Sequence, residues 1–123
     1  MADVESAKHR NAYVDPAGGR MRYGELAGAW AEVQDWAETT RQGWGQTVKR
    51  LQPLWGLRLD DVDKLALERL RADLAKRYSR RVVRNTMLRA LAIARYGFEC
   101  GYVGRDPTIG VEAVVPGVRF AHC

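Results

Sequence analysis

Residues 76–98 read KRYSRRVVRNTMLRALAIARYGF, and this stretch decides both the fold class and the charge distribution of the chain. It carries seven of the 20 basic side chains and no acidic side chain. The remaining 13 basic side chains are outnumbered by the 15 acidic ones, so this single stretch accounts for the net charge of +5.

The apolar residues of this stretch recur with the period of an amphipathic α-helix. One half of the helical wheel holds its apolar and small side chains, namely Val82, Val83, Thr86, Met87, Ala90, Leu91, Ile93, Ala94 and Phe98. The other half holds its polar side chains, namely Arg81, Arg84, Asn85, Arg89, Arg95 and Tyr96. Ser79 is the predicted N-cap, and Gly101 is the predicted stop after the helix. We therefore expect one face in the core and an arginine strip on the other.

The arginine strip has a chemistry that suits nucleic acid. Arginine pairs with phosphate and with guanine, and the asparagine among these arginines pairs well with adenine. Basic helix faces are also common on ordinary solvated surfaces, so the strip alone leaves both interpretations open.

The composition indicates one globular domain of 123 residues, because 46% of the residues are hydrophobic and 28% are charged. The two cysteines and the two histidines, His9 and His122, are too few and too far apart for a disulfide framework or a metal site. We expect no metal and no cofactor. No apolar run approaches the length of a membrane span, and no signal pattern opens the chain. These features predict a cytoplasmic protein without membrane contact.

Three further helices are expected before the basic stretch. The first, residues 23–37, contains acidic side chains and no basic one, and Trp30 lies at the centre of its apolar arc. The second has residues 38–40 as its predicted caps and runs to about residue 52. From Thr39 onward it contains basic side chains and no acidic one, and Gly43 and Gly45 weaken it. The third, residues 64–75, follows an acidic group and has mixed charge.

The expected buried side chains and the domain limits follow from the same pattern. Trp30 and Leu91 are predicted core residues of the first and fourth helices. The third helix is expected to bury Val62, Leu65, Ala66, the stem of Arg69, Leu70 and Leu74. Residues 1–22 are expected to form an extended leader that docks through Tyr13 and Val14. Residues 23–107 are the predicted helical domain, and residues 108–123 form a tail, with loose chain from Asp106.

The order of charge along the chain favours a nucleic-acid partner. The first helix is acidic and the third is mixed, whereas the second and fourth helices are basic. If these two basic helices are neighbours, they form one positive surface without acids, which is what binding to duplex DNA requires. Two alternatives stay open, namely a helical protein-interaction domain with an acidic partner and a stand-alone DNA-binding regulator.

Several short motifs occur in a specific order between residues 19 and 111. They are GRMRYGELA at 19–27 followed by Trp30, Thr40 with Arg41, LQPLWG at 51–56, LDDV at 59–62, RNTMLRAL at 84–91 and GYVGRDP at 101–107. Their order resembles the core-binding domain of tyrosine recombinases, the phage-type integrases. This resemblance implies an all-α, four-helix orthogonal bundle of the SAM-like type with extended N-terminal and C-terminal tails.

The resemblance also implies a site and its partners. In that family the second and fourth helices meet the major groove of the recombination core site, so double-stranded DNA and other recombinase protomers on it are the expected partners. The residues at the matching positions of the second helix are Thr40, Arg41, Lys49 and Arg50. Those of the fourth helix are Ser79, Arg80, Arg81, Arg84, Asn85 and Arg89.

The catalytic arginine, His-x-x-Arg motif and tyrosine nucleophile of that family belong to a domain that would follow residue 123. We therefore expect no catalytic residue and no enzyme activity in this chain. None of the five tyrosines, Tyr13, Tyr23, Tyr78, Tyr96 and Tyr102, has the sequence context of an activated nucleophile.

Overall fold

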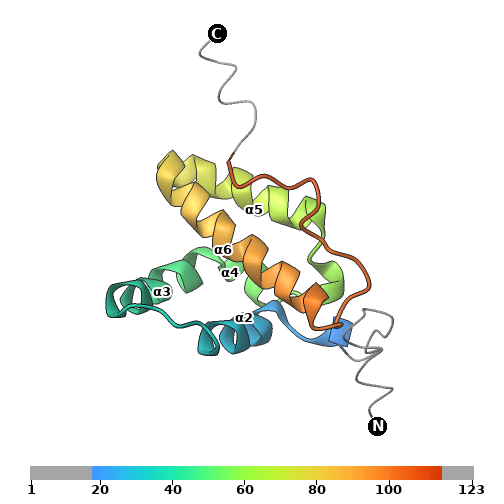
Figure 1. Ribbon diagram of the computed structural model, residues 1–123. Coiled ribbons are helices and arrows are strands. Elements are labelled where there is room, and N and C mark those ends of the chain that lie inside the picture. Colours follow the sequence, from blue (N-terminus) through green and yellow to red (C-terminus); the bar gives the residue numbers. More distant parts are fainter. Residues whose placement is uncertain (1–17, 115–123) are drawn as a thin grey trace.

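The computed structural model of the chain describes residues 18–114 and confirms the predicted all-α class (Figure 1). Within this range lie two short 3-10 helices, η1 (Gly18–Arg20) and η2 (Leu59–Asp61). The five α-helices are α2 (Tyr23–Glu32), α3 (Glu38–Arg50), α4 (Gln52–Trp55), α5 (Lys64–Arg77) and α6 (Arg80–Glu99). An isolated bridge between Arg22 and Arg58 is the only β pairing in this range. The expected docking of Tyr13 and Val14 lies outside it.

Helix α6 is the longest element, and it packs against both α5 and α2. Its predicted ends are confirmed. The Ser79 hydroxyl accepts a hydrogen bond from the Val82 N–H at 3.3 Å, and Gly101 has the left-handed φ of 81° that ends the helix. The helix begins at Arg80, because Tyr78 is extended and separates it from α5, to which Lys76 and Arg77 belong.

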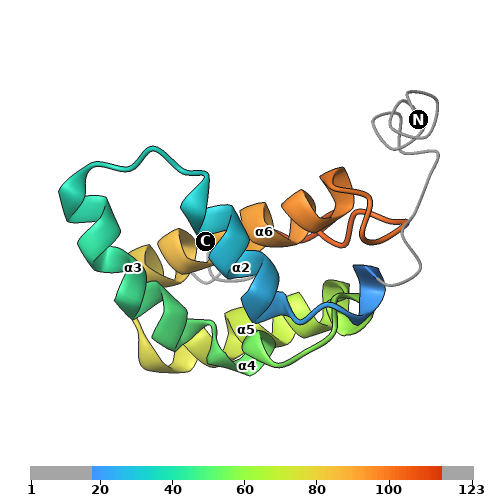
Figure 2. The same cartoon turned by 90° about the horizontal axis from the view of Figure 1, so that it is seen from below.

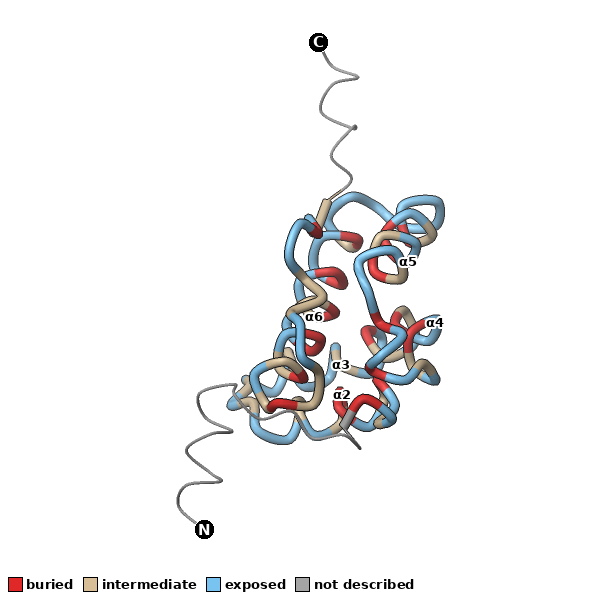
Figure 3. The backbone as a smooth tube through the Cα atoms, turned by 90° about the vertical axis from the view of Figure 1, so that its right-hand side faces the viewer, coloured by how far each residue is buried: buried red, intermediate tan, exposed pale blue. Residues whose placement is uncertain are grey.

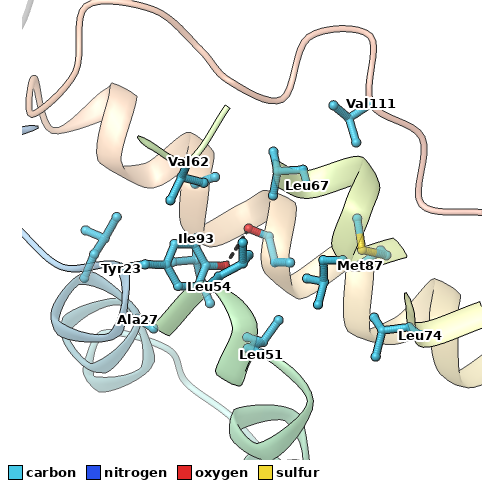
Figure 4. Packing of buried hydrophobic residues seen from close by; sticks show 14 of the residues in the cluster. Tyr23, Ala27, Leu51, Leu54, Val62, Leu67, Leu74, Met87, Ile93 and Val111 are labelled. Carbon is cyan, nitrogen blue, oxygen red and sulfur yellow. Dashed lines mark hydrogen bonds between the residues drawn. The ribbon is translucent and has the colours of Figure 1, made fainter. Parts of the chain in front are cut away.

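The core lies between the helices, on the sides where they face one another (Figure 3). Figure 4 shows Tyr23 of α2 and Leu54 of α4 packing toward Ile93 of α6. The Tyr23 hydroxyl donates a hydrogen bond to the Ala90 carbonyl oxygen at 2.9 Å. Burial of this hydroxyl raises the pKa of Tyr23 above its usual range. The side chain therefore fixes the distance between α2 and α6.

The buried face of α6 agrees with the wheel for most positions. The side chains of Val83, Thr86, Met87, Ala90, Ile93 and Ala94 are buried, as predicted. Leu91 is wrongly predicted as a core residue, because it lies at the edge of this face and is only partly buried. Trp30 is also only partly buried, because it belongs to a tryptophan cluster at the border of the core.

Helix α2 is shorter than predicted, since it ends at Glu32 and residues 34–37 form an irregular link. The link brings Trp36 against two other tryptophans, with ring centroids 5.5 Å from Trp30 and 5.4 Å from Trp44. The Gln34 side chain donates a hydrogen bond to the Trp30 carbonyl oxygen at 3.0 Å, which satisfies an acceptor at the helix end. A contact between distant residues thus overrides the local helical period.

Helix α3 ends at Arg50, two residues before the predicted end, and a separate short helix follows. Pro53 lies in the first turn of α4, where its missing N–H costs no intrahelical hydrogen bond. Leu51 and Leu54 at this junction are buried. The proline therefore starts a new helix and directs two leucines into the core.

The buried face of α5 differs from the prediction. Leu65 is 53% exposed and Arg69 is exposed, whereas Leu67 is fully buried and Arg71 is 8% exposed. Helix α5 packs chiefly on α6, and the segment after α6 contacts it as well. The Arg71 guanidinium donates a hydrogen bond to the Glu112 carbonyl oxygen at 2.8 Å.

The segment from residue 106 was expected to be loose, but up to residue 114 it contacts the helices. Val111 is only 9% exposed and joins the core. The Asp106 side chain accepts a hydrogen bond from the Thr108 N–H at 2.9 Å and lies 3.9 Å from the Arg95 guanidinium. These contacts fix the chain after α6 against α5 and α6.

Candidate nucleic-acid interface

The outward face of α6 carries the arginine strip that the sequence predicts. Arg81, Arg84 and Asn85 are exposed, as is Arg80 in the first turn. Their side chains form no hydrogen bond or ion pair with any other residue from 18 to 114. The spacing of three and four residues places the three side chains of the strip on one side of the helix. Four polar groups are therefore available to an external ligand.

Arg89 has a different role from the rest of the strip. Its guanidinium donates a hydrogen bond to the Thr47 hydroxyl of α3 at 3.1 Å. The guanidinium carbon also lies 5.1 Å from the ring centroid of Trp36. These two contacts connect α6 to α3 and to the link before it, so Arg89 holds the two basic helices together.

The contacts of Arg89 join the two basic helices, although α3 packs chiefly on α4. Both ribbon views place α3 and the N-terminal half of α6 at the same end of the molecule (Figure 1, Figure 2). The C-terminal end of α6 lies at the opposite end in both views, and in Figure 1 the segment that follows runs back along α5. The basic helices therefore form one end of the domain.

The candidates on α3 are divided between free and engaged side chains. Arg41 and Lys49 are exposed, and neither forms an ion pair within the described part of the chain. Eight residues separate them, which corresponds to about 12 Å along the helix axis. Thr40 is half-buried, and the half-buried Arg50 places its guanidinium carbon 5.1 Å from the ring centroid of Tyr78.

The cluster of Trp30, Trp36 and Trp44 supports this end of the domain, with ring centroids 5.4–5.9 Å apart. Aromatic pairs at such distances contribute about 0.5–1.5 kcal/mol each beyond their buried area. The cluster connects α2, the link and α3. Helix α3 is therefore stabilised by tertiary contacts, although Gly43 and Gly45 lower its intrinsic helix propensity.

The two glycines of α3 have no packing role within residues 18–114. A Cβ atom built on Gly43 or on Gly45 meets no other atom within 4 Å, and both residues are exposed. Gly45 lies four residues after Arg41 and four before Lys49, so it shares their side of the helix. The surface between these two cations is therefore formed by bare backbone.

Ion pairs in the described region involve other cations. They join Arg71 to Glu68, Arg77 to Asp73, and Arg95 to both Glu99 and Asp106, at 3.6–3.9 Å. Helix α6 has no acidic residue before Glu99. Helix α3 carries one acidic residue, Glu38 in its first turn, so basic side chains outnumber acidic ones on both helices and produce a positive potential.

Residues 18–114 contain neither a metal-binding cluster nor a membrane-spanning helix. No group of three or more His, Cys, Asp or Glu side chains between residues 18 and 114 is arranged to hold a metal ion. Within that range, each helix is too short or too polar to cross a lipid bilayer. Cys100 is a half-buried free thiol.

The sequence did not point to two features of this end of the molecule. The first is the contact of Arg89 with Trp36 and Thr47, which depends on the path of the link between α2 and α3. The second is a hollow beside Arg50 that includes Arg77 and Tyr78. The basic residues at the ends of α3 and α5 were visible in the sequence, but their convergence was not.

Comparison with known proteins does not assign the chain to a family. No protein-family model, no curated protein and no solved structure matches the chain.

Proposed function

We propose that this chain binds double-stranded DNA through α3 and α6, as the core-binding module of a site-specific tyrosine recombinase. In this proposal α2, α3, α5 and α6 are the four helices of the orthogonal SAM-like bundle, and α4 is a short addition. The observation that carries the proposal is the set of exposed, unpaired cations on two helices that the Arg89–Thr47 hydrogen bond connects, namely Arg41 and Lys49 on α3 and Arg80, Arg81 and Arg84 on α6.

The physical basis is neutralisation of backbone phosphates. Each phosphate contact releases condensed counterions, so affinity for duplex DNA falls steeply with salt. Asn85 lies among the arginines of α6 with no side-chain hydrogen bond inside the described region, so both its amide groups are free for a base edge. The arginines supply affinity and the asparagine supplies selectivity.

The chain acts in this proposal as a binding module and not as a catalyst. Tyr23 is buried and hydrogen-bonded to the Ala90 carbonyl, so it has no access to a scissile phosphate. Catalytic groups come from a further domain of the recombinase, and neighbouring protomers bind the adjoining half-site.

The direct test is a titration of labelled duplex DNA at several salt concentrations. We expect the logarithm of the association constant to fall linearly with the logarithm of salt concentration, by about 0.9 per phosphate contact. Selection from a pool of random duplexes then provides a preferred site and a scrambled control. Absence of duplex binding at low salt, or tighter binding to an acidic peptide, would refute the proposal in favour of a protein-interaction domain.

Asn85→Ala is expected to reduce selectivity without reducing general affinity. If Asn85 pairs with an adenine, the selected duplex loses about 1–3 kcal/mol of binding free energy. The scrambled duplex at low salt should bind as tightly as it does to the parent, because no charge is lost. Equal affinities of parent and variant for both duplexes would remove Asn85 from the base-reading set.

Gly45→Ala is expected to stabilise the protein and yet weaken DNA binding. Alanine in an open helix position adds up to about 1 kcal/mol of stability relative to glycine. The added methyl group lies between Arg41 and Lys49, where it separates the helix backbone from a bound phosphate. We expect binding to weaken roughly threefold to tenfold, or about 1 kcal/mol.

Gly43→Ala is the matched control, because Gly43 is equally exposed but points to another side of α3. It should raise the melting temperature by a similar amount and leave duplex affinity unchanged. If both variants bind DNA as the parent does, the bare backbone at Gly45 has no part in binding.

A further inference from the structure

A concave hollow of about 360 Å³ lies where the ends of α3 and α5 meet. Its polar lining comes from Lys49, Arg50 and Gln52 on one side and from Asp73, Arg77 and Tyr78 on the other. Three basic residues thus line a space with a single acidic residue. Basic side chains gathered in this way attract an anion.

The Arg77 cation is only weakly engaged. Its guanidinium lies 3.7 Å from the Asp73 carboxylate, and the two side chains are 67% and 41% exposed. Exposed ion pairs of this kind contribute little to stability, so Arg77 is free to turn toward a stronger anion. Lys49 is exposed and forms no ion pair within residues 18–114.

The Arg50 cation is oriented by the protein. Its guanidinium carbon lies 5.1 Å from the ring centroid of Tyr78. Stacking on an aromatic ring uses the face of the guanidinium and leaves the N–H donors along its edge available. Those donors match the oxygen atoms of a phosphate group, which arginine binds in a bidentate manner.

We propose that this hollow binds a backbone phosphate of duplex DNA at the border between α3 and α5. The inference rests on the proposed DNA-binding function and extends the interface to Arg77 and Tyr78, outside α6. The phosphate accepts hydrogen bonds from Arg50 and Arg77, and Lys49 adds a third positive charge. Because every duplex presents such phosphates, this contact contributes affinity at all sequences and no selectivity.

A different role for the same cations is stabilisation of helix ends. Lys49 and Arg50 lie in the last turn of α3, and Arg77 lies in the last turn of α5. Cations at these positions interact favourably with the helix dipole. Loss of such an interaction lowers the melting temperature and leaves DNA affinity unchanged, so the two roles have different experimental signatures.

The test compares Arg77→Ala with Arg105→Ala in titrations of selected and scrambled duplexes. Arg105 is an exposed arginine in the loop after α6, so its replacement also removes one positive charge, but at a position that does not line the hollow. We expect Arg77→Ala to bind both duplexes roughly eightfold more weakly at about 0.1 M salt, with a salt slope smaller by about 0.9. Arg77→Lys should retain the slope, and Arg105→Ala should bind like the parent.

The opposite results are equally clear. Parental affinity and slope for Arg77→Ala, with or without a lower melting temperature, would overturn the proposal. A second experiment measures melting temperatures in the presence of inorganic phosphate. If phosphate raises the melting temperature of the parent but not of Arg77→Ala, while both bind duplex DNA equally well, the hollow binds a free anion and the proposal is wrong. A parent that does not bind duplex DNA would refute the proposed function itself.

Discussion

Replacing both Arg81 and Arg84 by alanine is expected to weaken duplex binding roughly 60-fold at about 0.1 M salt. Two phosphate contacts are lost, and each contributes about 0.9 to the slope of log affinity against log salt concentration. Both side chains are exposed and have no hydrogen bond or ion pair with another described residue. The free energy of unfolding should therefore stay within about 0.5 kcal/mol of the parental value. Fluorescence anisotropy at several salt concentrations and a urea titration measure the two quantities.

The control for this double variant is Arg58→Ala with Arg105→Ala. Both residues are exposed, and neither belongs to α3 or α6. The control also removes two positive charges, so it reproduces any effect of net charge alone. If the two double variants bind with the same affinity and slope, the outward face of α6 is ordinary solvated surface. A bidentate contact to guanine by either arginine would add a loss of selectivity of about 1–3 kcal/mol.

The sequence predicted α6 well because its signals are local. The Ser79 cap, the stop at Gly101 and the buried side from Val83 to Ala94 all follow from residues within the helix or next to it. The exposure of Arg81, Arg84 and Asn85 follows from the same period. A long helix with clear caps and a uniform apolar face leaves few alternative arrangements.

The errors occur where contacts between distant residues decide the structure. The apolar period of α2 continues beyond Glu32, but the packing of Trp36 between Trp30 and Trp44 ends the helix there. Periodicity within α2 contains no information on Trp44, which lies in the next helix. For the same reason the contact of Arg89 with Trp36 was not predicted, although its position on the polar half of α6 was.

The candidate site shows the same division. The sequence identified the basic helices and their exposed side chains, because charge and period are properties of each helix alone. It did not identify the hollow, because Arg50 and Arg77 are 27 positions apart and converge only through the packing of α3 against α4 and α4 against α5. Which cations share one anion is therefore a property of the fold.

Leu67→Ala is expected to lower the free energy of unfolding by about 2–5 kcal/mol, because Leu67 is fully buried in the core and alanine leaves a cavity. The same helix provides the control, since Leu65 is 53% exposed and Leu65→Ala should change the free energy by no more than about 0.5 kcal/mol. Both substitutions remove the same atoms and have nearly equal helix propensity, so the difference reports burial alone.

This pair of variants decides which face of α5 enters the core. The helical period allows two alternative buried faces for α5, and both include Leu70 and Leu74. One face adds Leu65, Ala66 and Arg69, and the other adds Leu67 and Arg71. The second face is the buried one, and on it the Arg71 guanidinium donates a hydrogen bond to the Glu112 carbonyl oxygen. Urea titrations with tryptophan fluorescence, compared at equal m-values, measure both free energies. A larger loss for Leu65→Ala than for Leu67→Ala would mean that α5 is rotated about its axis and buries the first face.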